Sequence, residues 1–157
     1  MDLRKYLLDT FGYNDQTNLQ LLKKISELPD PSACIKYFSH LINNQNKWMA
    51  RILQDSAALQ MDWWDPVYPF EELEAKWKDS LNTWKEYLAG KSEAELTHEV
   101  TFVGYDGTRW AATPADIALQ LNYHSIHHRA QMQTIIREQG VEPDFVDFIG
   151  TRYRKLN

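Results

Sequence analysis

Two histidines near the C-terminal third of the chain are the most informative candidates for chemistry in this sequence. His124 and His128 fall on the apolar stripe of a predicted helix, where interior side chains are expected. Positions four apart on a helix have Cβ atoms about 5–6 Å apart, so two imidazoles there can bind one metal ion. His127 stands three residues after His124, also a workable spacing, so spacing alone leaves the ligand pair open. The alternative is two buried histidines that hydrogen-bond within the core.

A catalytic metal site uses three protein ligands and keeps one position open. His40 lies near the edge of the apolar face of another predicted helix, on a strip with Tyr37, Asn44 and Trp48 that could form a pocket wall. His98 lies in an irregular stretch, where a solvated histidine needs no special explanation. The residues themselves do not choose between His40 and His98 as the third ligand.

Two asparagines, Asn14 and Asn18, point inward in the middle of the first predicted helix. An unsatisfied buried amide costs about 1–3 kcal/mol, so each needs a partner. Contacts to a metal ligand or to substrate would satisfy them, and so would a polar patch bonded within the core.

No glutamate accompanies the histidine pair, unlike the HExxH zinc proteases, so no general base comes with the motif. The candidates for that role are His127, Tyr37 and, more remotely, Asp116. Each also has a simpler interpretation: a residue beside the ligands, a core aromatic and an acid at a helix start, respectively.

Four amphipathic helices must position these side chains. Apolar residues recur at spacings of three and four in four segments, which span 3–28, 31 to about 58, 70 to about 89, and 114 to about 139. Asp30 and Thr113 are the expected N-caps of the second and fourth helices, each followed by proline. This pattern predicts an all-α four-helix bundle, and two long connections mean that up-down-up-down order is not guaranteed.

The connections carry weaker signals. Residues 98–111 are compatible with a short β-hairpin, and residues 144–154 with a short C-terminal helix. The tryptophan loop, residues 61–68, could cover a pocket mouth or a dimer interface, or simply plug one end of the bundle.

Composition narrows the classes of protein. The chain has 157 residues, which suits a single domain over 1–157, and a formal net charge of −5, which is unlike a nucleic-acid binder. No apolar run approaches the ~18 residues of a membrane span. The single cysteine, Cys34, cannot form an internal disulfide. We expect a cytoplasmic protein with neither nucleic acid nor membrane as partner.

The sequence also resembles a known family. The stretch from His40 to Arg51 looks like the second-helix motif of the DinB-like family, and Asn122 to Gln131 is similar to its fourth-helix signature, usually written NHxxxHRGQ. Tyr13-Asn14 with Asn18, and Pro143 to Phe148, resemble the first-helix pattern and the C-terminal ending of that family. The resemblance covers essentially the whole chain and implies the DinB-like type of four-helix bundle.

The resemblance implies His40, His124 and His128 as metal ligands, with His127 as a neighbour and His98 outside the site. It further implies a divalent metal ion, zinc foremost, or nickel, which a nickel column can also introduce. The residues expected around the ligands or along the pocket are Asn14, Asn18, Asn44 and Trp48.

Two positions depart from the family signature: Ala130 replaces a usual glycine, and Tyr123 separates Asn122 from His124. Neither change removes a ligand. A surface ion pair or a dimer contact is the simplest interpretation of Arg129.

These observations favour a metal-dependent enzyme with a mononuclear three-histidine site. Characterised relatives suggest transfer that depends on a low-molecular-weight thiol, or hydrolysis, at the open metal position, and family members are often homodimers. The alternative is a non-catalytic metal-binding or homodimeric interaction module. A role as a DNA-damage effector has little physical support, because the basic residues form no run.

Overall fold

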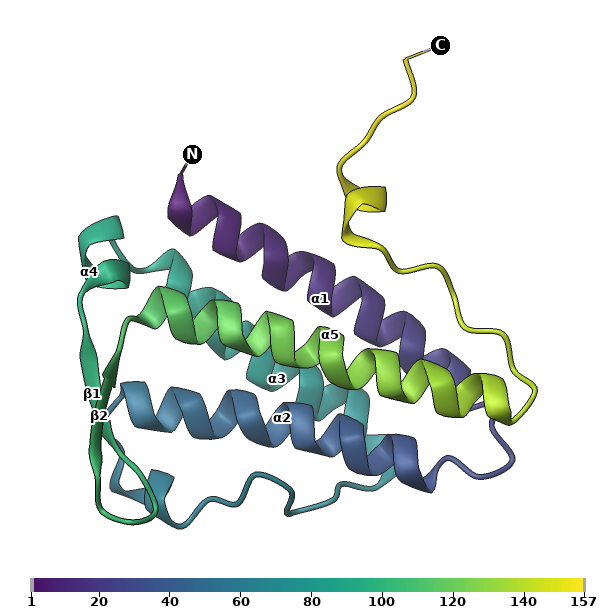
Figure 1. Ribbon diagram of the computed structural model, residues 1–157, viewed down its shortest axis with the longest axis horizontal. Coiled ribbons are helices and arrows are strands. Elements are labelled where there is room, and N and C mark those ends of the chain that lie inside the picture. The colour runs from purple at the N-terminus through teal and green to yellow at the C-terminus, as the bar shows by residue number, and fades with distance from the viewer. Residues whose placement is uncertain (1, 157) are drawn as a thin grey trace.

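Helices dominate the computed structural model, which describes residues 2–156 (Figure 1). The α-helices are α1 (Leu3–Ile25), α2 (Ser32–Ile52), α3 (Phe70–Ala89), α4 (Glu93–Thr97) and α5 (Pro114–Glu138). The remaining elements are the 3-10 turns η1 (Ser56–Leu59) and η2 (Phe148–Thr151) and the strands β1 (Val100–Val103) and β2 (Arg109–Ala112). The expected all-α fold with a short hairpin is confirmed.

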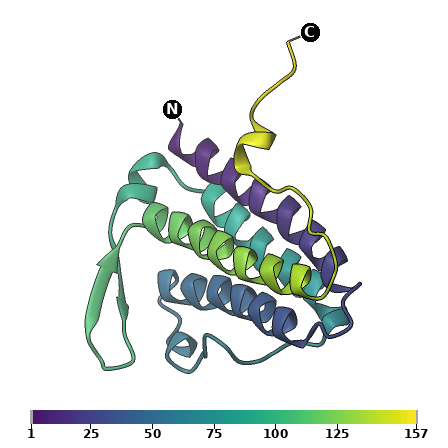
Figure 2. The ribbon, with the colours of Figure 1, turned by 45° about the vertical axis from the view of Figure 1, so that its right-hand side comes forward.

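The four long helices form a bundle in which consecutive helices are not always neighbours. Both α3 and α5 pack against α1 and α2, so α1 and α2 lie across a diagonal of the bundle. In Figure 1, α1 and α5 run in one direction and α2 and α3 in the other, while the connection from α2 to α3 returns along the bundle. The turned view in Figure 2 shows the same arrangement. The long connection therefore replaces up-down-up-down order with a crossover.

Aromatic side chains fill the centre of the bundle. Trp84 stacks on Phe11 with ring centroids 5.9 Å apart, and Trp77 meets Phe38 edge to face at 5.5 Å. The indole N–H of Trp84 donates to the main-chain oxygen of Gln45 at 2.9 Å, so this buried polar group is paired. These contacts tie α1, α2 and α3 into one core.

The caps predicted for α5 are present. The Thr113 hydroxyl accepts from the backbone N–H of Asp116 at 3.1 Å, and Pro114 occupies the first turn. Gly140 follows the helix with φ +82°, a left-handed conformation that suits glycine. Helix α5 is therefore set by local sequence at both ends.

Helix α2 differs from its expected boundaries. It begins at Ser32, and the Asp30 carboxylate accepts from the backbone N–H of that residue at 3.0 Å. It ends at Ile52 rather than near Ala58, because Gln54 has φ +58° and leaves the helical conformation. Asp55 then caps the separate turn η1.

Three other segments differ from the elements expected from the sequence. Helix α1 ends at Ile25, one turn before the expected end at 28. The short helix α4 was not expected, although Ser92 and Glu95 form a capping box that marks its start. Its five residues are too few to show a helical period. Within 144–154 the expected C-terminal helix is only the turn η2.

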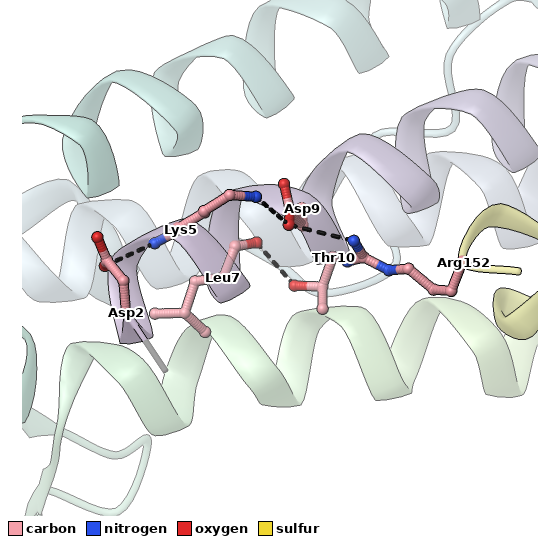
Figure 3. A network of polar contacts seen from close by, with 6 residues as sticks. All are labelled: Asp2, Lys5, Leu7, Asp9, Thr10 and Arg152. Atoms are coloured by element: carbon pink, nitrogen blue, oxygen red, sulfur yellow. Dashed lines mark hydrogen bonds and ion pairs between the residues drawn. The ribbon is translucent and has the colours of Figure 1, made fainter. Parts of the chain in front are cut away.

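A polar network attaches the C-terminal segment to α1 (Figure 3). The Asp9 carboxylate accepts from Lys5 at 2.8 Å and from Arg152 at 3.2 Å. Asp2 caps the helix by accepting from the backbone N–H of Lys5 at 3.0 Å. Across the residues described, none of the helices combines the length and the apolar character that crossing a bilayer requires.

Candidate metal centre

Packing of α2 against α5 brings three histidines together. The Nε2 atom of His124 lies 3.2 Å from Nε2 of His40 and 2.9 Å from Nε2 of His128. One ligand atom from each of the three lies within 4.8 Å of the other two, so the three side chains could hold a metal ion. His98 is exposed in the turn between α4 and β1 and is not part of this group.

Hydrogen bonds at Nδ1 of His40 and Nδ1 of His128, on the side of each ring away from the cluster, determine which ring nitrogen carries the proton. The Nδ1 atom of His40 is 2.6 Å from the main-chain oxygen of Trp63, and Nδ1 of His128 is 2.6 Å from Oε1 of Gln131. Both oxygens can only accept, so each Nδ1 carries the hydrogen. In the neutral rings, Nε2 of His40 and Nε2 of His128 therefore keep free lone pairs.

The donor set fits a cation. Nε2 of His40 and Nε2 of His128 both lie within 3.2 Å of Nε2 of His124, and the three neutral rings offer at most one proton among these nitrogens. Asn44 donates to the main-chain oxygen of His40 at 2.8 Å, and its amide nitrogen also lies 3.1 Å from Nδ1 and 3.3 Å from Nε2 of the His40 ring. Three imidazole nitrogens facing one point are the ligands that zinc and similar divalent ions prefer.

Burial keeps the three rings neutral. Desolvation lowers the pKa of His124 to about 4, with further lowering from the nearby His128, His40 and His127. Desolvation also lowers the pKa of His40, against the raising effects of Trp63 and Asp62. The pKa of His128 is lowered for the same reason, partly offset by Gln131. Metal binding requires unprotonated imidazoles, which this environment supplies at neutral pH.

One side of the cluster is covered and another reaches the surface. The indole of Trp64 stacks on the His40 ring, with centroids 3.7 Å apart and planes within 9°. His40 and His128 are buried, whereas His124 is only partly so. His124 is therefore the ligand candidate of the three with the greatest contact with solvent.

The other candidate residues lie at various distances from the cluster. The Tyr37 ring is 5.2 Å from that of His128, and the exposed His127 ring is 4.9 Å from it. Trp48 packs on Trp63 at 5.9 Å. Asp116 bonds to Thr113 in the first turn of α5, two turns before His124.

Asn14 and Asn18 bond to Arg129 rather than to the histidines. The guanidinium donates to Oδ1 of Asn14 at 3.1 Å and to Oδ1 of Asn18 at 2.9 Å. It also donates to the hydroxyl of Tyr13 at 3.1 Å. The interpretation of Arg129 as a surface ion pair or dimer contact is wrong, because the residue is 2% exposed. Burial lowers its pKa, but an arginine stays charged.

The sequence assigned no role to Gln131, and it left the tryptophan loop open between covering a pocket mouth or a dimer interface and plugging the bundle. A signal existed for Gln131, because it stands three residues after His128 and so shares its face of the helix. The loop contacts had no such signal, since they join residues 23 apart through the return of the chain along α2.

Comparison with known proteins agrees with the fold and the cluster. A search of curated proteins finds no match to this chain. The family model of the DinB superfamily matches residues 16–132, which include His40, His124 and His128. The match extends over about three quarters of the sequence. The chain therefore belongs to the DinB superfamily.

Proposed function

We propose that this protein is a metal-dependent enzyme that transfers a low-molecular-weight thiol to a small substrate. The observation that carries the proposal is the convergence of Nε2 of His40, His124 and His128, with two of the far nitrogens already committed as donors. A divalent ion in such a site makes a coordinating thiol or water a nucleophile at neutral pH.

The chain's own residues supply the rest of the site. Within the described residues, the metal-type ligand group consists of the three histidines alone, which leaves a coordination position for an outside molecule. His124 is partly exposed to solvent, and Trp64 stacks on the His40 ring and shields it from water. Lowered histidine pKa values keep the ligands available.

The thiol must come from outside the chain. Cys34 is fully buried, and burial raises the pKa of its thiol to about 11, so it is neither accessible nor ionised. A thiol suits this site because coordination itself deprotonates it, without a separate base. Hydrolysis is the second candidate, favoured by the exposed imidazole of His127 beside His128, which could accept a proton from water.

Metal content is the decisive first measurement. We expect about one zinc per chain in untagged protein never exposed to a nickel column, and little in His124→Ala. A structural zinc site is worth about 10–16 kcal/mol over four ligands, so one ligand accounts for roughly 100- to 1000-fold in Kd. His98→Ala is the matched control, because its side chain is exposed and outside the cluster.

A thiol-binding experiment distinguishes the proposed enzyme from a protein that only binds the metal. In cobalt-substituted protein, a low-molecular-weight thiol should produce thiolate-to-metal charge-transfer absorption. Metal without thiol binding or hydrolytic activity would favour the non-catalytic module. Absence of metal, with no affinity for added zinc, would leave the histidines as core residues.

A further inference from the structure

The tryptophan loop lies along α2 and reaches the proposed metal centre. Two of its consecutive residues contact the same ligand: the main-chain oxygen of Trp63 faces Nδ1 of His40, and the Trp64 ring covers the imidazole. A loop on the surface is held only as firmly as its anchors hold it. The residues that anchor this loop therefore affect which ring nitrogen of His40 carries the proton.

Three polar residues on α2 are almost fully buried at intervals of four: Ser39, Asn43 and Lys47, with exposed fractions of 0%, 3% and 1%. That spacing places them on one strip of the helix, beside His40. Buried polar groups, a lysine above all, are costly unless they are paired. The strip is polar because each of its side chains has a hydrogen-bond partner in the tryptophan loop.

Each of the three side chains bonds to the main chain of the tryptophan loop. Ser39 accepts from the N–H of Tyr68 at 3.0 Å, Asn43 donates to the oxygen of Pro66 at 3.1 Å, and Lys47 donates to the oxygen of Met61. Residue numbers rise along the helix as they fall along the loop, so the loop is strapped antiparallel to α2. Unlike apolar packing, which is non-directional, these bonds specify one register.

Lys47 makes further contacts that hold the middle of the loop. Its ammonium lies over the Trp63 ring, 4.5 Å from the centroid, and it also donates to the hydroxyl of Tyr105 from the β1–β2 turn. Asp62 accepts from the backbone N–H groups of Trp64 and Asp65, which tightens the turn between the anchors. The Trp63 side chain is therefore held by Lys47, and the backbone that follows the Trp63 carbonyl is held by Asp62.

We propose that Ser39, Asn43 and Lys47 are positioning residues that strap the tryptophan loop to α2, and so hold the proton of His40 on Nδ1 and leave Nε2 for the metal. With the loop displaced, Nδ1 loses its acceptor at 2.6 Å and the Nε2–H tautomer, which cannot bind a metal through Nε2, becomes populated. The metal part of this inference rests on the proposed function, whereas the tautomer part does not.

Lys47→Met tests the strap, because methionine keeps the apolar stem and removes the donor. In the metal-free variant, ring ¹⁵N shifts should show His40 gaining Nε2–H tautomer while His128, bonded to Gln131, does not change. The zinc Kd should weaken roughly 10- to 100-fold, the range typical for loss of a partner that orients a ligand. Lys78→Met is the matched control: it makes the same change at an exposed lysine that pairs with Glu74 on α3, away from the loop, and should leave the tautomer as in the parent.

Ser39→Ala provides a second variant at the opposite end of the loop, should Lys47→Met fail to fold. It removes the acceptor for Tyr68 and should move the His40 tautomer in the same direction. An unchanged His40 tautomer in the folded variants overturns the strap, whether or not zinc binding changes. If the parent binds no zinc but the variants still shift the tautomer, the proposed function falls and the strap stands.

Discussion

Helix α5 carries two polar clusters on different sides, and they differ in what completes them. The histidine cluster consists of His124 and His128 with His40 from α2. The arginine cluster consists of Arg129 with Tyr13, Asn14 and Asn18 from α1. Both stand within two turns of one helix, and both are largely buried.

The balance of donors and acceptors separates the two clusters. In the arginine cluster, guanidinium hydrogens meet amide and hydroxyl oxygens, and Tyr13 donates onward to the main-chain oxygen of Val146. In the histidine cluster, nitrogen lone pairs face one another with too few protons to pair them. The chain itself pairs the guanidinium and the two amide oxygens of the first cluster, although the amide nitrogen of Asn14 is buried without a hydrogen-bond partner. The three histidines of the second cluster could instead hold a metal ion. The arginine cluster ties α5 to α1, whereas the histidine cluster is the candidate metal site.

Arg129→Met should disrupt the arginine cluster and should lower the free energy of unfolding more than any other substitution proposed in either cluster. The variant leaves the buried Oδ1 atoms of Asn14 and Asn18 without their main donor, at about 1–3 kcal/mol each. We expect a net loss of about 3 kcal/mol in the free energy of unfolding, hence a Tm lower by roughly 6–12 °C. Denaturant and thermal unfolding measure it.

Zinc affinity should stay within about twofold in folded Arg129→Met, because the hydrogen bonds found for the Arg129 guanidinium in the described chain go to Tyr13, Asn14 and Asn18 and not to the three histidines. Arg152→Met is the matched control: its ion pair with Asp9 is exposed and should be worth less than about 1 kcal/mol. A stability close to the parent's in Arg129→Met would contradict the structural role.

Gln131→Leu should perturb the histidine cluster without comparable loss of stability. It removes the acceptor that holds the proton of His128 on Nδ1. The expected result is a zinc Kd weaker by about tenfold, the lower part of the range for such partners. Isothermal titration against a competing chelator measures the change.

Gln131→Glu sharpens the same comparison, since a carboxylate accepts this bond more strongly and raises the basicity of the ring. Its zinc affinity should match or exceed that of the parent. A leucine variant that binds zinc like the parent would show that Gln131 has no part in the site.

Lowering the pH should reduce the free energy of unfolding of the metal-free protein through protonation of the histidine cluster, and not through the arginine cluster. The folded pKa of His124 is about 4, below the ordinary value of 6.5, so the unfolded chain binds protons that the folded one refuses. Stability is therefore complete above about pH 6.5 and is lost as the pH falls toward the folded pKa. His40, His128 and His127 lower the pKa of His124 in addition to burial.

His124→Gln isolates this contribution. Between about pH 6.5 and about pH 5, its free energy of unfolding should change less than that of the parent, by about 1 kcal/mol. Urea unfolding of both metal-free proteins across this range tests the sign. A steeper pH dependence in the variant would show that His124 is not held neutral by burial.

Much of this arrangement was predictable where the interactions are local. The caps at Thr113 and Gly140 and the four-residue spacing of His124 and His128 depend on neighbours along one helix, and the structure agrees with them. The end of α2 was not predictable from apolar spacing, since it depends on the backbone conformation of Gln54. The short α4 was missed although its capping box was readable.

The sequence by itself determined the helices and the pair of histidines that share one helix face, because a 3.6-residue period and cap chemistry act over a few residues. Residue spacing left His40 and His98 open and the family resemblance implied His40, but only the tertiary structure showed that α2 packs against α5 and brings His40 beside the pair. It also decided that Arg129 is buried against α1, and that the tryptophan loop returns along α2 to His40. Contacts between distant segments carry no periodic signal, because they arise from how the helices pack.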